Sequence, residues 1–90
     1  MTKKLTAEAA ITFTTTKPLS PECESALQKA ASVYFGLNDD QYLFASNIVA
    51  PAIEDAIALM VGAVRTILFL HSDDEGWGMR VIEAQARVLA

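Results

Sequence analysis

The chain opens with a segment in which apolar and polar residues alternate, and this pattern constrains the fold more than any other feature of the sequence. From residue 5 to residue 13 every second residue is apolar, and most of the residues between them are polar. A period of two is typical of a β-strand with one buried face, so we predict a strand over residues 5–16 that ends at Lys17-Pro18. A lone strand leaves its backbone amides unpaired, so this strand requires a partner strand.

The end of the chain is the candidate partner, although its pattern allows two interpretations. Residues 79–88 alternate as a strand would, with apolar residues at 82, 84, 86 and 88. The same residues also separate onto apolar and charged faces of a helix. We expect a strand here, because residues 5–16 need a hydrogen-bonding neighbour and we identify alternation in no other segment.

Helical signals begin at Ser20. Its hydroxyl can cap the first turn, Pro21 suits the first helical position, and apolar residues then recur at helical spacing as far as Tyr34. Gly36 is suited to a left-handed helix cap. We therefore predict a helix over residues 21–35.

A second helical start follows directly. Asn38 is a candidate cap, and Gln41, three residues later, can reach back to it as in a capping box. The short connection predicts a helical hairpin. Within its second arm Pro51 would remove a backbone hydrogen bond at a cost of about 3 kcal/mol, so we expect that arm to be kinked or broken at residues 47–51 and to resume from Pro51.

Residues 52–71 are apolar on nearly every side of a helix. A narrow stripe of small and charged residues is the exception: Glu54, Ala58, Gly62 and Arg65. Such a helix needs cover on most sides, whereas a chain of ninety residues buries only about 60 to 65% of its unfolded surface. We therefore expect a homo-oligomer, most simply a dimer, in which Ala58 and Gly62 let a neighbouring helix come close and Arg65 lies at the rim of the contact.

Together these elements predict one small α+β domain spanning residues 1–90. It contains an N-terminal strand, a helical hairpin whose second arm is kinked at Pro51, and a C-terminal strand or helix. The composition agrees with a folded domain, because 52% of the residues are hydrophobic and 20% are charged.

Charge and hydropathy exclude several classes of partner. Seven Lys and Arg residues against eleven Asp and Glu residues give a net charge of −4, and no basic cluster exists beyond Lys3-Lys4, so we expect no nucleic-acid partner. The most apolar run, residues 56–70, is shorter than the ~20 residues of a membrane span, so we expect no membrane partner. The single cysteine, Cys23, suits a reducing compartment, and we expect a cytoplasmic location.

Residues that could carry chemistry are few. One imidazole and three carboxylates lie within five residues, at His71, Asp73, Asp74 and Glu75. Their spacing matches no metal-binding motif, so a helix-capping turn is the simpler interpretation. A nucleophilic role for Cys23 would need a nearby base, and no glycine-rich phosphate loop is present. We expect no catalytic residue, no metal and no cofactor.

The turn from residue 72 to residue 79 is the candidate recognition surface. Asp73, Asp74 and Glu75 would steer a basic partner towards this turn. Trp77, flanked by two glycines, would fill a pocket of that partner, and Met79 would belong to the same binding surface. The alternative is that Trp77 packs in the core, as a large aromatic residue usually does in a small domain.

From these features we predict a small, acidic, non-enzymatic interaction protein. It would act as an adaptor or inhibitor that occupies the surface of an unidentified partner protein, as short acidic proteins of phages and mobile elements often do, an association by size and charge alone. The alternative is a protein that senses or sequesters a small ligand in a pocket between helices.

Overall fold

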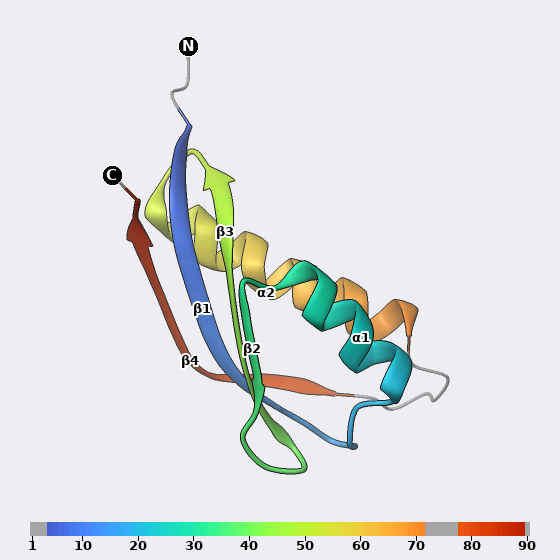
Figure 1. Ribbon diagram of the computed structural model, residues 1–90. Helices are drawn as coiled ribbons and strands as arrows, with labels where there is room; N and C mark the ends of the chain where they lie inside the picture. The colour runs from blue at the N-terminus through green and yellow to red at the C-terminus, as the bar shows by residue number, and fades with distance from the viewer. Residues whose placement is uncertain (1–3, 72–77, 90) are drawn as a thin grey trace.

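A four-stranded antiparallel sheet forms the frame of the molecule (Figure 1). The structure is a computed structural model that describes residues 4–71 and 78–89. Its elements follow in the order β1 (Leu5–Thr15), α1 (Pro21–Ala30), β2 (Val33–Gly36), β3 (Gln41–Ala50), α2 (Ile53–Leu70) and β4 (Met79–Val88). The strand order is β2-β3-β1-β4, which together with the βαββαβ sequence of elements is the split-βαβ, or ferredoxin-like, topology. The predicted α+β class is confirmed.

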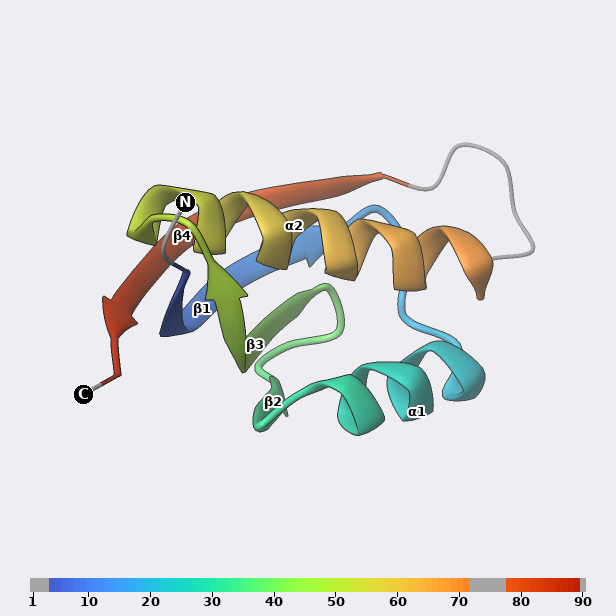
Figure 2. The same ribbon diagram turned by 90° about the horizontal axis from the view of Figure 1, so that it is seen from above.

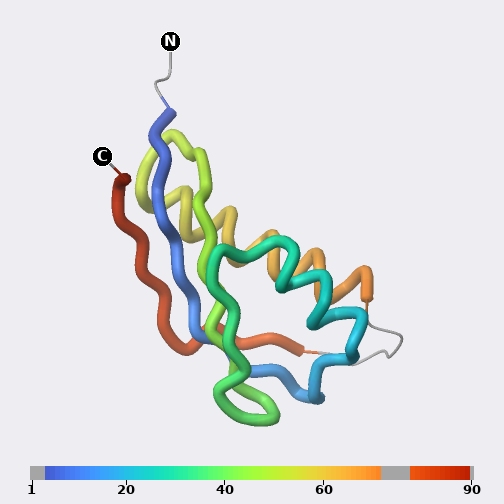
Figure 3. Tube along the Cα trace, in the orientation of Figure 1, coloured from blue at the N-terminus to red at the C-terminus, as the bar shows by residue number. Residues whose placement is uncertain are grey.

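The strand predicted over residues 5–16 is confirmed as β1, which lies inside the sheet between β3 and β4. The side chains of Ala7, Ala9, Ile11 and Phe13 are fully buried on one face. β1 pairs with β3 on one side and with β4 on the other, so the predicted strand over residues 79–88 and its pairing with β1 are both confirmed. The register of β4 shifts between Thr12 and Phe13 of β1, which leaves Ile82 as an extra residue, and β4 bends in its course (Figure 3).

α2 lies against β1, β3 and β4 and covers one face of the sheet (Figures 1 and 2). It buries residues at a spacing of four, which form a single face: Ala56, Met60, Val64 and Leu68. The predicted helix over residues 52–71 is thus confirmed, within one residue at each end. The expectation that it would be covered on nearly every side is not met within the described part of the chain, because its outer face is exposed.

α1 begins where the sequence predicts and ends earlier. The Ser20 hydroxyl accepts a hydrogen bond from the amide of Cys23 at 3.2 Å, and α1 then buries Cys23 and Leu27. The predicted extent to residue 35 is wrong, because the chain leaves the helix after Ala30 and enters β2. The β-branched and aromatic residues 33–35 favour a strand, and β3 supplies the hydrogen-bonding edge that stabilises it.

The predicted helical hairpin is also wrong, since residues 41–50 form β3. Asn38 does not cap a helix; its side-chain amide donates to the Gln41 side chain at 2.7 Å within the turn between β2 and β3. Asparagine and aspartate favour turns as well as helix caps, so the same residues suit both structures. Pro51 lies between β3 and α2 and kinks no helix. Figure 3 shows the β2–β3 turn projecting from the molecule.

Candidate functional site

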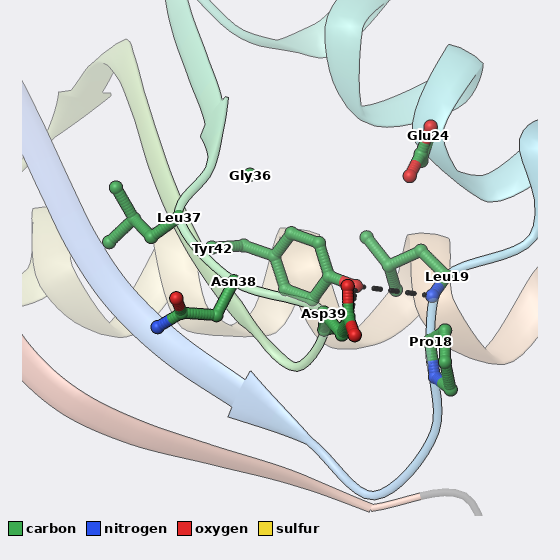
Figure 4. Close-up of a pocket in the computed structure, with 8 residues that line it drawn as sticks. All are labelled: Pro18, Leu19, Glu24, Gly36, Leu37, Asn38, Asp39 and Tyr42. Carbon is green, nitrogen blue, oxygen red and sulfur yellow. Dashed lines mark hydrogen bonds between the residues drawn. The ribbon is translucent and has the colours of Figure 1, made fainter.

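A shallow groove lies between the start of α1 and the β2–β3 turn (Figure 4). Its volume is about 600 Å³, and its lining residues are Pro18, Leu19, Glu24, Gly36, Leu37, Asn38, Asp39 and Tyr42. The Tyr42 hydroxyl accepts a hydrogen bond from the Leu19 amide at 3.2 Å and donates one to the Asp39 carbonyl at 2.7 Å. This hydroxyl therefore holds the two sides of the groove together.

Two groups behind the groove are poor candidates for chemistry at neutral pH. The ring of Tyr34 stacks on that of Tyr42, with centroids 6.3 Å apart, and the Tyr34 hydroxyl is buried without a partner in the described chain. Burial, assisted by Glu24, raises the pKa of Tyr34 above its ordinary value. Burial, again assisted by Glu24, raises the pKa of the Cys23 thiol to about 11, so this thiol stays protonated and unreactive.

A second surface lies on the sheet face turned away from the helices. Tyr42 and Phe44 point to the core, so the alternating residues Leu43 and Ala45 point to the other face. Val33 of β2 pairs with Ala45 and Phe35 pairs with Leu43. We call this group the sheet patch, and its members are Val33, Phe35, Leu43 and Ala45. Val33 is 40% exposed and Phe35 is 55% exposed, so large apolar side chains meet solvent beside the sheet edge.

A third surface is the outer face of α2. We define it by six residues that point away from the sheet: Leu59, Gly62, Ala63, Thr66, Phe69 and Leu70. Phe69 is 82% exposed and Leu70 is 68% exposed. The Thr66 hydroxyl donates to the Gly62 carbonyl at 2.8 Å, so its polar group already has a partner within the helix. These six positions carry no charge, and the charged residues exposed on the same helix are Glu54, Asp55 and Arg65.

The residues predicted to form an oligomer interface lie on or beside this outer face. Ala58, Gly62 and Arg65 are all exposed on α2. A Cβ atom added at Gly62 would meet no other atom within 4 Å, so the space above this residue is open. The structure thus brings these three residues together on one side of the helix.

The predicted partner-binding residues are for the most part outside the described residues. This holds for Asp73, Asp74, Glu75 and Trp77. Met79 is described: it begins β4, pairs with Thr15 and is half-buried against the core. His71 directly follows α2, where its backbone amide donates to the Ile67 carbonyl, and it is exposed.

The sheet patch does not emerge from the sequence patterns, because residues 33–35 and 38–50 were predicted to be helical. The alternation of Tyr42, Phe44 and Ala50 with more exposed residues was the available signal. That alternation assigns Leu43 and Ala45 to the outer sheet face once β3 is recognised as a strand.

Comparisons with known proteins do not assign the chain to a group: no family model, no curated protein and no solved structure matches it. Among residues 4–71 and 78–89, no three His, Cys, Asp or Glu side chains come together in an arrangement that could hold a metal ion. No helix in these two ranges has both the length and the hydropathy needed to cross a membrane. Function must therefore be inferred from the surfaces of the molecule.

Proposed function

We propose that the protein is a non-enzymatic interaction protein, an adaptor or inhibitor, that binds a partner protein through the sheet patch. The observation that carries this proposal is the exposure of Phe35, at 55%, beside Val33 and over Leu43. Contiguous exposed apolar side chains mark interaction sites on small proteins, and aromatic residues contribute strongly to binding energy at such sites. The patch would act as the centre of the contact.

The position of the patch also favours recognition of a protein. Within residues 4–71 and 78–89, β2 is an edge strand that pairs with β3 alone, so its outer backbone groups are available to an extended segment of a partner. A partner that adds a strand here would gain main-chain hydrogen bonds and would cover Phe35 at the same time.

Acidic residues next to the sheet patch favour a partner with basic residues. Asp39 and Asp40 are exposed in the turn that joins β2 to β3, and the chain carries a net charge of −4. A partner with basic residues around an apolar centre would be complementary to this arrangement. We place the interaction in the cytoplasm as part of the same proposal, because the single cysteine is buried and free.

A paired substitution tests the proposal. Phe35→Ser removes the aromatic side chain from the patch, whereas Val49→Ser removes an equally exposed apolar side chain, 59% exposed, from the far end of the same sheet face. Proteins captured from the native host by the wild-type chain should be lost with Phe35→Ser and retained with Val49→Ser. Titration of the captured partner should show binding at least about tenfold weaker for Phe35→Ser.

The proposal fails if a partner binds both variants as it binds the wild type, with circular dichroism showing that both are folded. The acidic tryptophan segment remains a separate prediction from the sequence. If Trp77→Ala abolishes binding and Phe35→Ser does not, that segment is the recognition surface instead of the sheet patch.

A second candidate function is the binding of a small ligand, and the groove beside Tyr42 is the observation that favours it. The groove is large enough for a small molecule and carries the carboxylates of Glu24 and Asp39 together with the aromatic ring of Tyr42. A cationic or hydrogen-bond-donating ligand would suit this lining. Native mass spectrometry of protein purified from its host would show the added mass of a bound ligand.

A further inference from the structure

The outer face of α2 exposes large apolar side chains that the fold itself leaves uncovered. Leu59 is 49% exposed, and Phe69 and Leu70 are more exposed still. The opposite face of the same helix is already occupied by the sheet. Within the described part of the chain the outer face therefore stays open to contact with another molecule.

We propose that α2 packs antiparallel against α2 of a second copy, in a symmetric dimer in which Glu54 of each subunit lies near Arg65 of the partner subunit. This contact uses a different surface from the sheet patch, so a dimer could still present a sheet patch on each subunit.

The order of charged and small residues along α2 indicates that the molecule covering its outer face is a second copy of this chain. Glu54, Ala58, Gly62 and Arg65 are spaced so that they follow one side of the helix, at intervals of four, four and three residues. A two-fold axis perpendicular to two antiparallel helices reverses this order on the partner. If the axis passes midway between Ala58 and Gly62, Ala58 lies opposite the partner's Gly62, and the partner's Arg65 lies level with the exposed carboxylates at the start of the helix, opposite Asp55 and one residue from Glu54.

The same stripe argues against a parallel pair. Parallel helices related by symmetry would bring Glu54 level with the partner's Glu54 and Arg65 level with the partner's Arg65, so like charges would meet at both ends. The antiparallel arrangement is therefore the one that matches unlike charges. Exposed charge pairs add little affinity, but they determine the orientation in which two surfaces associate.

Both charged groups are available for this pairing. Glu54 and Arg65 are exposed, and neither has an ion-pair or hydrogen-bond partner among the described residues. They cannot pair with each other within one helix, because eleven residues of helix separate them by about 16 Å along the axis. A second copy in the antiparallel orientation would supply a partner for each.

Packing in the middle and at the ends of the contact is also favourable. Ala58 and Gly62 permit close approach of the helix backbones, and the space above Gly62 is open. Phe69 continues the stripe one turn beyond Arg65 and would reach the start of the partner's α2, near the partner's Pro51. A stable interface buries about 800 Å² per subunit, so the large side chains Phe69 and Leu70 are needed to extend the contact beyond the small central residues.

Charge reversal tests the orientation directly. Sedimentation velocity of the complete chain at high micromolar concentration should give twice the chain mass of 9.7 kDa. Arg65→Glu and Glu54→Arg should each weaken dimerisation by about tenfold or more, because each places like charges together at both ends of the contact. The double variant with both substitutions should restore the dimer, since unlike charges then face each other again.

Two further variants distinguish a loss of the dimer contact from a loss of fold stability. Gly62→Gln adds bulk where the helices approach but meets no neighbour within its own chain, so it should give a folded monomer. Glu22→Arg makes the same charge change on the exposed surface of α1 and should leave the dimer intact. Circular dichroism should show the same secondary structure in all of these variants.

The proposal is overturned if the wild-type chain sediments as a monomer at high micromolar concentration. It is equally overturned if the dimer survives Arg65→Glu and Gly62→Gln, or if the double charge variant stays monomeric while folded. Dissociation of the dimer by Phe35→Ser, with α2 variants remaining dimeric, would assign the self-association to the sheet patch instead.

Discussion

The backbone amide of Leu19 donates a hydrogen bond to the hydroxyl of Tyr42 across 3.2 Å, although 23 residues separate the two in sequence. This bond joins the segment that leads into α1 to the start of β3. Leu19 and Tyr42 are both buried, so water cannot replace the interaction if it is lost. The position of α1 over the β2–β3 hairpin depends in part on this one hydroxyl.

Removal of that hydroxyl should destabilise the fold. Tyr42→Phe leaves the buried Leu19 amide without an acceptor, which should lower the free energy of unfolding by about 1–3 kcal/mol. Urea denaturation monitored by circular dichroism measures the change. Tyr34→Phe is the matched control: its hydroxyl is buried without a partner among the described residues, so its removal should be neutral or stabilising. Equal losses for the two variants would show that the hydrogen bond is not the cause.

The helix cap at Ser20 should contribute measurably to stability. Ser20→Ala removes the oxygen that accepts from the Cys23 amide, and it should cost about 1 kcal/mol. Ser25→Ala, on the exposed surface of the same helix, should instead be neutral or slightly stabilising because alanine is the better helix former. Thermal unfolding of the two variants compares them directly, and a loss in Ser25→Ala as large as in Ser20→Ala would contradict the capping role.

Stability should fall at alkaline pH because of the buried Cys23 thiol. Burial, assisted by Glu24, raises its pKa from 9.0 to about 11 in the folded chain. Below about pH 9 the thiol is protonated in both states, and its full contribution to stability is present. As the pH rises through 11 this contribution is lost, because the thiol ionises more readily in the unfolded chain than in the folded one. The loss should amount to about 2–3 kcal/mol of unfolding free energy.

Urea titrations from about pH 8 to pH 11 measure this dependence, and Cys23→Ala should flatten it. Burial shifts the pKa of Tyr34 in the same direction, so Tyr34→Phe should remove a further part of the decline above about pH 10. An unchanged pH profile in Cys23→Ala would show that the thiol does not carry the effect.

Gly62 should lower the unfolding free energy of the isolated subunit relative to alanine at the same position. A Cβ atom at this position meets nothing within 4 Å, and alanine is favoured over glycine in a helix interior by about 1 kcal/mol. Gly62→Ala should therefore raise the unfolding free energy by about that amount when measured at concentrations where the chain is monomeric. A decrease would mean that the glycine is needed for the conformation of α2.

Several elements of this fold follow from local patterns. The alternation in residues 5–13 predicts β1, and the requirement of a strand for a partner predicts β4 at residues 79–88. Ser20 and Pro21 specify the start of α1. These predictions hold because each rests on a backbone requirement, either a cap or a ladder of hydrogen bonds, that the neighbouring residues reveal.

The hairpin of β2 and β3 could not be identified with the same patterns. Asn38 and Gln41 suit a helix start and a turn equally well, and the spacing of Tyr34 from Leu27 suits a helical stripe. Residues 33–36 and 42–45 form strands because they pair with each other. Such pairing depends on residues that are not adjacent in sequence, so a local pattern does not reveal it. The sheet patch depends on that pairing and was missed with it.

The sequence by itself determined the α+β class, the N-terminal strand, the long helix and the start of α1, because these depend on periodicity and capping within a few residues. It favoured a strand at residues 79–88 only because the N-terminal strand needs a hydrogen-bonding neighbour. Only the tertiary structure decided that residues 33–50 form a hairpin and that α2 covers one side of a sheet. Backbone hydrogen bonds between distant segments determine which of two locally acceptable conformations a segment adopts. That choice then determined which apolar side chains, among them Phe35 and Phe69, stay exposed.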